Sequence, residues 1–492
     1  MAVASGSLPC AIEVTGSGGS PVYHSAVAGS GSGPFTVNAS PLTELVTAQA
    51  GGVSPATLFS EFTTRSAAIT STSLASGVTY VQTALKSVVD LTGVNPLSDT
   101  LVAANGTTAG NALDTKIDAV VAQLATAQTT LAQVVTAVIT NPTAPDTLTA
   151  VVQTAAADCS RFRSGKYRMI NPMEPDPLWR AHVLKIDVTA LSATTFNGET
   201  VKFVSNGAGL CSYTVTGKDA NGTVTETHKF TVSSSGILVV YSTSASNGSH
   251  WLTIGLPEQT LALSELAGTY NRLAFGTSNP LLPSAVFQGT GSLDAAGHDT
   301  GGSECVDILP CVAYQPPYDT LAADTTNGGF VLTQANDGRQ WRIFAFKGAN
   351  GTAVAIGIAT NDKATDPSFI VFTTAKKQTL PTLPFTNSTW NFQVNANHTV
   401  AALAENTYVY NSVDTATRIV TRTRDDGLVD SMTYDTPRDG MRYRANNSCS
   451  KNGAAQNCAG LIQMPLQGLG ITLYGSLSTS ASPFFGMGVT KP

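Results

Sequence analysis

The chain has 492 residues, of which 12% are charged and 42% are hydrophobic, and its formal net charge at pH 7 is −6. This length predicts two to four domains, and the charged fraction, about half of the roughly 25% usual in soluble domains, is typical of secreted and cell-surface β-proteins whose surfaces are wetted by hydroxyl and amide groups. The acidic balance offers no electrostatic basis for binding nucleic acid or anionic lipid, and no stretch reaches the roughly 18 apolar residues of a membrane-spanning helix.

Residues 1–40 are rich in Gly, Ser and Pro, which predicts one or two short strands joined by loops, a strand or linker remnant ahead of the first domain. The N-terminal sequence lacks the positively charged and long apolar pattern of a signal peptide. If the protein is exported, we therefore expect the chain to be a fragment of a longer protein whose leader has been removed.

Residues 41–158 have the pattern of a helical bundle. The dipeptides Ser40-Pro41 and Ser54-Pro55 each have the form of an N-cap residue followed by a proline at the first helical position. Both sites therefore predict the start of a helix.

The strongest helical signal runs from Leu113 to Val138, where apolar residues alternate spacings of four and three. Such a heptad pattern predicts one helix of close to thirty residues. The positions between carry Thr, Gln and Ala in place of the charged residues that select coiled-coil partners, which favours packing within the chain's own bundle over self-association. Weaker signals predict a helix over residues 77–91 and a last one in "DTLTAVVQTAAA".

After Cys159 the apolar period changes from about 3.6 to 2 residues, as in "SYTVTGK", "TVTETHKFTV", "QWRIFAFKG" and "TRIVTRTR". Asn-Gly and Asp-Gly turns, such as "DANG", "NDG" and "DDG", separate these segments and supply the positive φ that hairpins need. The predicted fold class is therefore α+β multidomain: an N-terminal helical bundle followed by antiparallel β-meander domains, barrel-like or sandwich, over residues 159–262 and 263–492.

A faint internal repeat places Gly-x-Tyr at the start of a strand, first at Gly165 and Tyr167 and again at Gly268 and Tyr270. The segment "STWNFQV" (388–394) is a weaker third copy. A glycine and an aromatic residue that open a run of hairpins resemble the start of lipocalin-type meander barrels. The repeat predicts two tandem β-domains.

The seven cysteines include no CxxC or CxxCH arrangement, so zinc ribbons and c-type haem are not expected. Their spacing predicts three local disulfides and hence an oxidising compartment, the alternative being a set of reduced thiols. The predicted pairs are Cys159–Cys211, Cys305–Cys311 and Cys449–Cys458, with Cys10 left over.

Four cations crowd into one short segment between the helices and the strands, namely Arg161, Arg163, Lys166 and Arg168. We interpret them as charges on the solvent face of an edge strand, where they discourage sheet-to-sheet association, and as compensation for the dipole at a helix C-terminus. The alternatives are an anion or glycan site, and an ion pair with Glu174 or Asp176 at a domain interface.

Catalytic signatures are sparse. The sequence contains no G-x-S-x-G elbow, P-loop, G-x-G-x-x-G fingerprint or paired-histidine spacing, so we expect neither a cofactor nor a metal site. His298, Asp299 and Ser303 are weak candidates for a serine triad, with no oxyanion-hole signature beside them. Asp425 and Asp426 would point to opposite faces of a strand and cannot act together as general acid and base.

Tryptophan and tyrosine side chains in or beside the predicted strands either fill barrel interiors or line a ligand cavity. A cavity walled by them would be apolar and would suit a lipid-like or aromatic molecule. The candidate ligand-binding residues are Tyr167, Trp179, Trp251, Tyr270, Trp341 and Trp390.

The phrase "PLTELVTAQAGGVSPATLF", followed by a helical stretch and then by "CSRFRSGKYRMI", resembles large secreted or outer-surface proteins of Gram-negative bacteria. The resemblance implies a helical segment followed by lipocalin-like β units and an extracellular or outer-surface location, without an assigned activity. We expect a non-enzymatic protein that binds a small apolar ligand or an extracellular matrix component. The alternatives are a secreted hydrolase of esters or glycans with dispersed catalytic residues, and a filament or surface-layer subunit.

Overall fold

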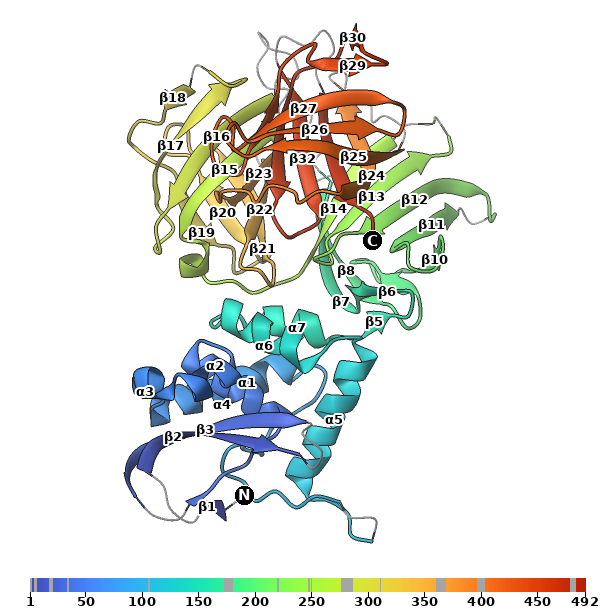
Figure 1. Ribbon diagram of the computed structural model, residues 1–492. Coiled ribbons are helices and arrows are strands. Elements are labelled where there is room, and N and C mark those ends of the chain that lie inside the picture. Colours follow the sequence, from blue (N-terminus) through green and yellow to red (C-terminus); the bar gives the residue numbers. More distant parts are fainter. Residues whose placement is uncertain are drawn as a thin grey trace. The chain divides into compact units, whose positions relative to one another are not determined.

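The computed structural model describes residues 2–3, 7–16, 21–32, 35–104, 107–171, 180–218, 221–246, 248, 250–275, 286–309, 311–359, 369–395, 403–477 and 484–492. The chain separates into two compact units (Figure 1). The N-terminal unit comprises residues 1–156 together with 349–351, and the C-terminal unit comprises residues 157–348 and 352–492.

The N-terminal unit combines helices with a β-hairpin (Figure 1). Within the range 1–40, expected to hold short strands, the described residues include the long antiparallel pair β2 (Ser7–Thr15) and β3 (Val22–Ser32). One apolar core joins Ala26 of the hairpin to the helices, so the unit is not a bundle of helices alone. The helices are α1 (Pro41–Gly51), α2 (Pro55–Ser60), α3 (Phe62–Arg65), α4 (Ser71–Leu85), α5 (Ala112–Thr126), α6 (Leu131–Thr140) and α7 (Pro145–Val152).

Both predicted helix starts are confirmed. The Ser40 hydroxyl accepts a hydrogen bond from the Thr43 N–H at 3.3 Å, and the Ser54 hydroxyl accepts one from the Thr57 N–H at 3.1 Å. A proline follows each cap at the first helical position. These bonds satisfy amide donors that have no partner within the first turn of a helix.

The single long helix predicted from Leu113 to Val138 is wrong. The segment forms α5 and α6, which are separated by a turn at Gln128 with φ of 49°. Thr130 caps α6: its hydroxyl accepts from the Gln133 N–H at 3.3 Å, while Gln133 Oε1 accepts from the Thr130 N–H at 2.8 Å. The apolar spacing survives the break because both helices face the same core. The Thr-x-x-Gln capping box was the sequence signal that could have revealed it.

Replacing Thr130 with alanine is expected to lower the free energy of unfolding of the N-terminal unit by about 1 kcal/mol, because the Gln133 N–H loses its capping acceptor. Thr136, exposed in the middle of α6, is the matched control. Thr136→Ala is expected to be neutral or slightly stabilising, because alanine has the higher helix propensity. Urea unfolding followed by far-ultraviolet circular dichroism measures both variants, and equal losses would contradict the capping role.

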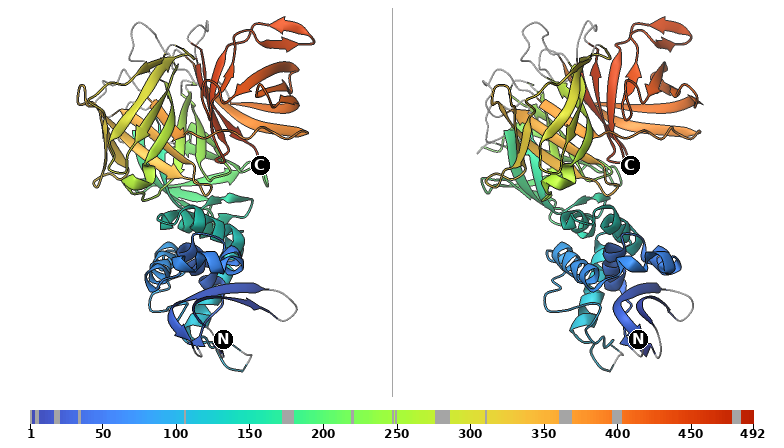
Figure 2. Two further views of the ribbon diagram at one scale, coloured as in Figure 1. Left: turned by 60° about the vertical axis from the view of Figure 1, so that its left-hand side comes forward. Right: turned by 90° about the vertical axis from the view of Figure 1, so that its left-hand side faces the viewer.

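The C-terminal unit contains three antiparallel sheets in chain order. Figure 2 shows the deep orange and red strands of the third sheet beside the strands of the other two, which run from green through yellow to light orange. The first sheet is a closed barrel of β7 (Gly165–Ile170), β8 (Ala181–Asp187), β9 (Ser192–Thr194), β10 (Thr200–Ser205), β11 (Ser212–Lys218), β12 (Val224–Val232), β13 (Leu238–Ser244) and β14 (His250–Pro257).

The second sheet contains β15 (Gly268–Phe275), β16 (Val286–Leu293), β17 (Asp299–Val306), β18 (Cys311–Ala313), β19 (Thr320–Ala323), β20 (Phe330–Thr333), β21 (Gln340–Lys347), β22 (Ala353–Ala359) and β23 (Phe369–Thr374). The third contains β24 (Phe385–Asn395), β25 (Ala404–Asp414), β26 (Ile419–Arg424), β27 (Leu428–Tyr434), β28 (Arg442–Arg444), β29 (Cys449–Lys451), β30 (Ala454–Gln456), β31 (Leu461–Leu466), β32 (Ile471–Ser476) and β33 (Phe484–Thr490).

Each sheet is a meander whose first and last strands pair, so that each forms a ring: β7 pairs with β14, β15 with β23, and β24 with β33. A bridge between His298 and Thr320 completes the second ring. The third ring consists of β24 to β28 and β31 to β33. The hairpin of β29 and β30, inserted between β28 and β31, is not part of the ring. The predicted antiparallel strands are confirmed, and the range 263–492, expected as one β-domain, holds two of the three rings.

The Gly-x-Tyr repeat marks equivalent positions in the first strands of the first two rings. Gly165 and Gly268 have φ of 148° and 149°, a region that favours glycine. The hydroxyls of Tyr167 and Tyr270 each donate to the carbonyl four residues upstream, at 3.1 Å and 2.6 Å. Burial raises the pKa of each tyrosine to about 12. The weaker copy "STWNFQV" lies in β24, the first strand of the third ring.

The three rings pack against one another through their outer faces, around one apolar core. Its fully buried members include Val239 of β13, Phe392 of β24 and Met487 of β33, together with Ile356 of β22 at 2% exposure. Neighbouring residues of a strand point to opposite faces, so the residues that flank these positions face the ring interiors. The apolar side of several strands therefore lies outside the rings, and the interiors are free to differ in polarity.

The edge-strand interpretation of the cationic segment is wrong for β7, because this strand pairs with both β8 and β14 in the closed barrel. Arg168 instead links the first two rings: its guanidinium lies 3.1 Å from Glu258 and donates to the Asn327 carbonyl at 3.0 Å. Glu174 and Asp176, the expected partners at an interface, lie outside the described residues.

The three predicted disulfides are confirmed, and all lie in the C-terminal unit: Cys159–Cys211, Cys305–Cys311 and Cys449–Cys458. Cys10 is a half-exposed free thiol of the N-terminal unit.

Candidate functional site

The first ring has a packed aromatic interior. Phe162 of β6 (Cys159–Arg163) is fully buried, and its ring centre lies 4.9 Å from that of Tyr213 and 5.5 Å from that of Phe230. Phe203 and Tyr167 complete the cluster, at 5.6 Å and 6.4 Å from Phe162. Rings at these separations pack as a core. The structure thus places Tyr167, a candidate ligand-binding residue, inside this cluster.

Two other predicted aromatic residues, Trp251 and Trp390, lie apart from each other. Trp251 of β14 is half-buried, with its ring edge-on to His228 at 6.1 Å. Trp390 is 4% exposed and belongs to the core between the rings. Trp179 lies outside the described residues. The structure therefore does not bring Trp251 and Trp390 together into one site.

The second ring encloses a cavity of about 400 Å³. Two predicted residues, Tyr270 of β15 and Trp341 of β21, line it together with the apolar side chains of Ile343, Ile370 and Phe372. Small-molecule sites commonly have volumes of roughly 300–1,000 Å³ and mostly apolar walls with a few polar groups. This cavity has a volume in that range, and its wall combines apolar side chains with several polar and charged ones.

The polar group of that cavity centres on Arg272, whose guanidinium donates to Glu304 and to the Tyr314 hydroxyl. Burial acts to lower the pKa of Arg272, but Tyr314 and Glu304 outweigh it and raise the pKa above its usual value. The buried Nε of Arg272 has no hydrogen-bond partner in the part of the chain that the structure describes. A fixed cation beside an unused donor can orient the polar end of a ligand.

Acidic side chains also line the cavity of the second ring, namely Asp299, Asp319 and Asp337. Burial raises the pKa of Asp299, and the charge of Asp319 raises it further. The cavity therefore combines an apolar wall with a negatively charged portion.

The structure does not assemble a triad from the three weak catalytic candidates. His298 Nδ1 lies 3.1 Å from Asp294, not from Asp299, and the Ser303 hydroxyl lies 3.2 Å from that of Thr290. Five residues along a strand span roughly 16 Å, which separates the imidazole from Ser303 by more than hydrogen-bond reach. Asp299 accepts from a backbone N–H two residues ahead.

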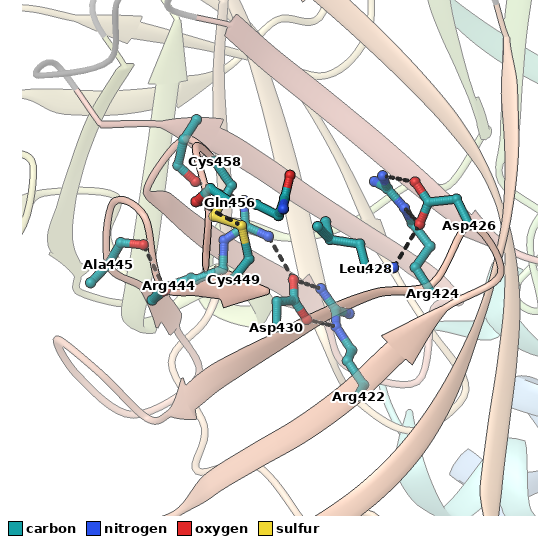
Figure 3. A network of polar contacts seen from close by, with 12 residues as sticks. Arg422, Arg424, Asp426, Leu428, Asp430, Arg444, Ala445, Cys449, Gln456 and Cys458 are labelled. Atoms are coloured by element: carbon teal, nitrogen blue, oxygen red, sulfur yellow. Dashed lines mark hydrogen bonds and ion pairs between the residues drawn. A yellow bond between two sulfur atoms is a disulfide. The ribbon is translucent and has the colours of Figure 1, made fainter. Parts of the chain in front are cut away.

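The third ring encloses a cavity of about 460 Å³ with polar walls. Arg422 of β26, Asp430 of β27, and Arg442 and Arg444 of β28 all line it. The two oxygens of Asp430 hold two guanidiniums: Arg422 Nε donates to Oδ1 at 2.7 Å, and Arg444 NH1 donates to Oδ2 at 2.6 Å (Figure 3). Both arginine side chains are only 9% exposed.

The ion pairs set the charge state of this cluster. Burial alone would raise the pKa of Asp430, but Arg422 and Arg444 outweigh it and lower the pKa. Burial lowers the pKa of Arg444 despite Asp430. At the rim, the bond to Arg424 lowers the pKa of Asp426 to about 2, so both carboxylates are ionised at neutral pH.

Aromatic rings support the other faces of the arginines. The Arg422 guanidinium lies 4.2 Å from the Tyr408 ring centre, and that of Arg442 lies 4.1 Å from the Tyr434 ring centre, both within cation–π range. Arg442 Nε donates to Gln378 Oε1 at 2.6 Å. These contacts fix the arginines in place without neutralising them.

One end of the third ring is closed by an apolar cluster of Tyr410, Val420, Met432 and Tyr434. Two residues beyond Arg422 along β26, Arg424 pairs with Asp426 through both carboxylate oxygens, and both side chains are partly exposed (Figure 3). The interior is therefore layered, with an apolar floor, a buried arginine layer and a charged rim.

The arginine cluster was not predicted from the sequence, although the spacing of its arginines is visible there. Arg422 and Arg424 in "TRIVTRTR", and Arg442 and Arg444 in "MRYR", repeat at a spacing of two, which places each pair on one face of a strand. Charges on one face of a strand indicate solvent exposure unless the sheet closes on itself. Only closure of the ring turns that face into an interior.

Among the described residues, no group of three or more His, Cys, Asp or Glu side chains is arranged to hold a metal ion. No described helix is long and apolar enough to span a membrane.

No protein-family model and no curated protein matches the chain. Among solved structures it is similar to a double mutant of transferrin-binding protein B from Haemophilus parasuis Hp5, at 7% identity over 63% of this chain and 66% of that chain, with a TM-score of 0.21. It is also similar to transferrin-binding protein B from serogroup B Neisseria meningitidis (10% identity, 69% and 68% covered, TM-score 0.20) and to a DUF3598-family protein of unknown function from Nostoc punctiforme (7%, 47% and 99%, 0.19). Scores this low do not establish a shared fold.

Proposed function

We propose that this chain is a non-enzymatic binding protein of the cell surface or extracellular space, and that a small, largely apolar molecule occupies the cavity of the second ring. The single observation that carries the proposal is the cavity of about 400 Å³ walled by Tyr270, Trp341 and Phe372. Arg272, Glu304 and Tyr314 would hold the ligand's polar group. Three disulfides favour an oxidising compartment.

Filling the cavity tests this assignment. Ala355 lies on the cavity wall, so Ala355→Phe is expected to remove at least 90% of the saturable uptake of N-phenyl-1-naphthylamine, a neutral apolar fluorophore, because a phenyl ring takes the ligand's space. Uptake by the full chain is measured by fluorescence enhancement.

Val312→Phe is the matched control, since it adds a comparable apolar group at a side chain that is 70% exposed on β18. It is expected to bind the fluorophore like the unmodified chain. Absence of saturable uptake by the unmodified chain, or equal uptake by both variants, would contradict the proposal.

A further inference from the structure

The side chains that line the cavity of the third ring carry an excess of positive charge. Its cavity is lined by four arginines and two carboxylates, which leaves a formal charge of 4 − 2 = +2. The remaining segments of this ring, residues 396–402 and 478–483, contain no Asp or Glu in their sequence. The arginines concerned are Arg422, Arg424, Arg442 and Arg444, and the carboxylates are Asp426 and Asp430.

Uncompensated charge away from water is strongly unfavourable unless a partner of opposite sign is supplied. Arg422 and Arg444 share the single carboxylate of Asp430, and each side chain is only 9% exposed. Burial lowers the pKa of Arg442, which means that the charged form of this guanidinium is destabilised at its position. One layer of the wall thus holds three cations, of which Arg422 and Arg444 are buried and Arg442 is half-buried, and one anion, Asp430.

The same layer presents hydrogen-bond donors that no described residue uses. Arg444 Nε is buried without a partner, while its terminal nitrogens donate to Asp430 and to the Ala459 carbonyl. Arg442 uses only its Nε, toward Gln378, within the described structure. The amide of Gln463, 7% exposed on β31, also lines this cavity.

We propose that the cavity of the third ring is a second binding site, specific for a small organic or inorganic oxyanion that carries about two to three negative charges, as carboxylates or a phosphate. Guanidinium forks match the paired oxygens of carboxylate and phosphate groups. The anion would contact Arg442 and Arg444 above the apolar floor, with Gln463 and Asn391 as neutral donors. Its charge would balance the +2 of the wall.

The second ring cannot serve this role. Its cavity is lined by one arginine and by four carboxylates, for a formal charge of 1 − 4 = −3. These are Arg272, Asp299, Glu304, Asp319 and Asp337. A dianion is repelled there and attracted to the third ring, so the two cavities select ligands of different charge.

Isothermal titration calorimetry of the full chain at low ionic strength, with citrate and separately with inorganic phosphate, tests the proposal. We expect saturable binding of at least one of them, and at least tenfold weaker binding by Arg442→Gln. The matched control is Arg65→Gln, which removes one positive charge at an exposed ion pair with Glu61 in the N-terminal unit and is expected to bind like the unmodified chain.

Asn391→Asp provides a second variant of nearly unchanged shape, should Arg442→Gln fail to fold. Asn391 lines the cavity from β24, and the added negative charge is expected to weaken anion binding at least tenfold. The tighter of the two probes assigns the site to carboxylates or to phosphates. Absence of binding of both probes, an unchanged affinity in Asn391→Asp, or an equal loss in Arg65→Gln would overturn the proposal.

The outcome is separable from that of the apolar site. Ala355→Phe is expected to leave citrate or phosphate binding unchanged, and Arg442→Gln is expected to leave uptake of the neutral fluorophore unchanged. Loss of both activities in either variant would show that the two cavities do not act independently and would overturn the assignment of a second site.

Discussion

Asp430→Asn is expected to lower the free energy of unfolding of the C-terminal unit by about 3–5 kcal/mol, because it leaves two buried guanidiniums without their only shared counter-charge. Arg422 and Arg444 approach the two oxygens of Asp430 at 2.7 Å and 2.6 Å. The loss is measured by urea unfolding, with hydrogen exchange of the β26–β28 amides locating it in the third ring.

Asp425→Asn is the matched control, five residues away in the same hairpin. Asp425 is exposed and accepts from the Thr407 N–H at 2.9 Å, and asparagine keeps an oxygen for that bond. Its effect is expected to stay within about 0.5 kcal/mol. Citrate is expected to restore part of the stability of Asp430→Asn if the anion site exists, because a ligand that binds only the native state stabilises it. Equal stability of the two variants would contradict the buried network.

Phe162→Ala is expected to cost about 3–5 kcal/mol, the range for removing a fully buried phenyl ring. Phe162 contacts four rings of the first barrel, and the ring of Tyr213 is the nearest at 4.9 Å. The residue is held from β6, beside the Cys159–Cys211 disulfide, so the cavity left behind cannot be filled by free movement of the strand. Urea unfolding together with near-ultraviolet circular dichroism reports the loss of aromatic packing.

Phe196 offers the same substitution at the surface of the same ring, where its side chain is 45% exposed. Phe196→Ala is expected to change the free energy of unfolding by no more than about 0.5 kcal/mol. A cost for Phe162→Ala as small as that for Phe196→Ala would mean that the interior of the first ring is not packed as described.

Much of the secondary structure could be predicted from short segments of the sequence. Ser40-Pro41 and Ser54-Pro55 start helices because capping depends on two or three adjacent residues. The Gly-x-Tyr repeat identified two equivalent first strands because the glycine conformation and the tyrosine hydrogen bond are both set within four residues. Cysteines that lie close along the chain, such as Cys305 and Cys311, have few other partners within reach.

The third ring could not be predicted from the repeat, because its first strand, β24, contains the weaker copy "STWNFQV" and has no Gly-x-Tyr. Its ends meet through the pairing of β24 with β33, which joins residues such as Trp390 and Val489 that are far apart in the sequence. The turn at Gln128 between α5 and α6 was not predicted for a related reason. The apolar spacing continues across a turn when the helices on both sides of it pack against one core.

What the sequence by itself determined is the alternation of each strand, its antiparallel hairpins and the short-range disulfides, since these depend on neighbouring residues. Only the tertiary structure decided which face of each strand is the interior. Alternation separates two faces without saying which one a closed sheet encloses. In the third ring the apolar face, with Phe392 and Met487, packs outward against the other rings. Arg422, Arg442 and Arg444 therefore point inward and become a charged cavity instead of a solvated surface.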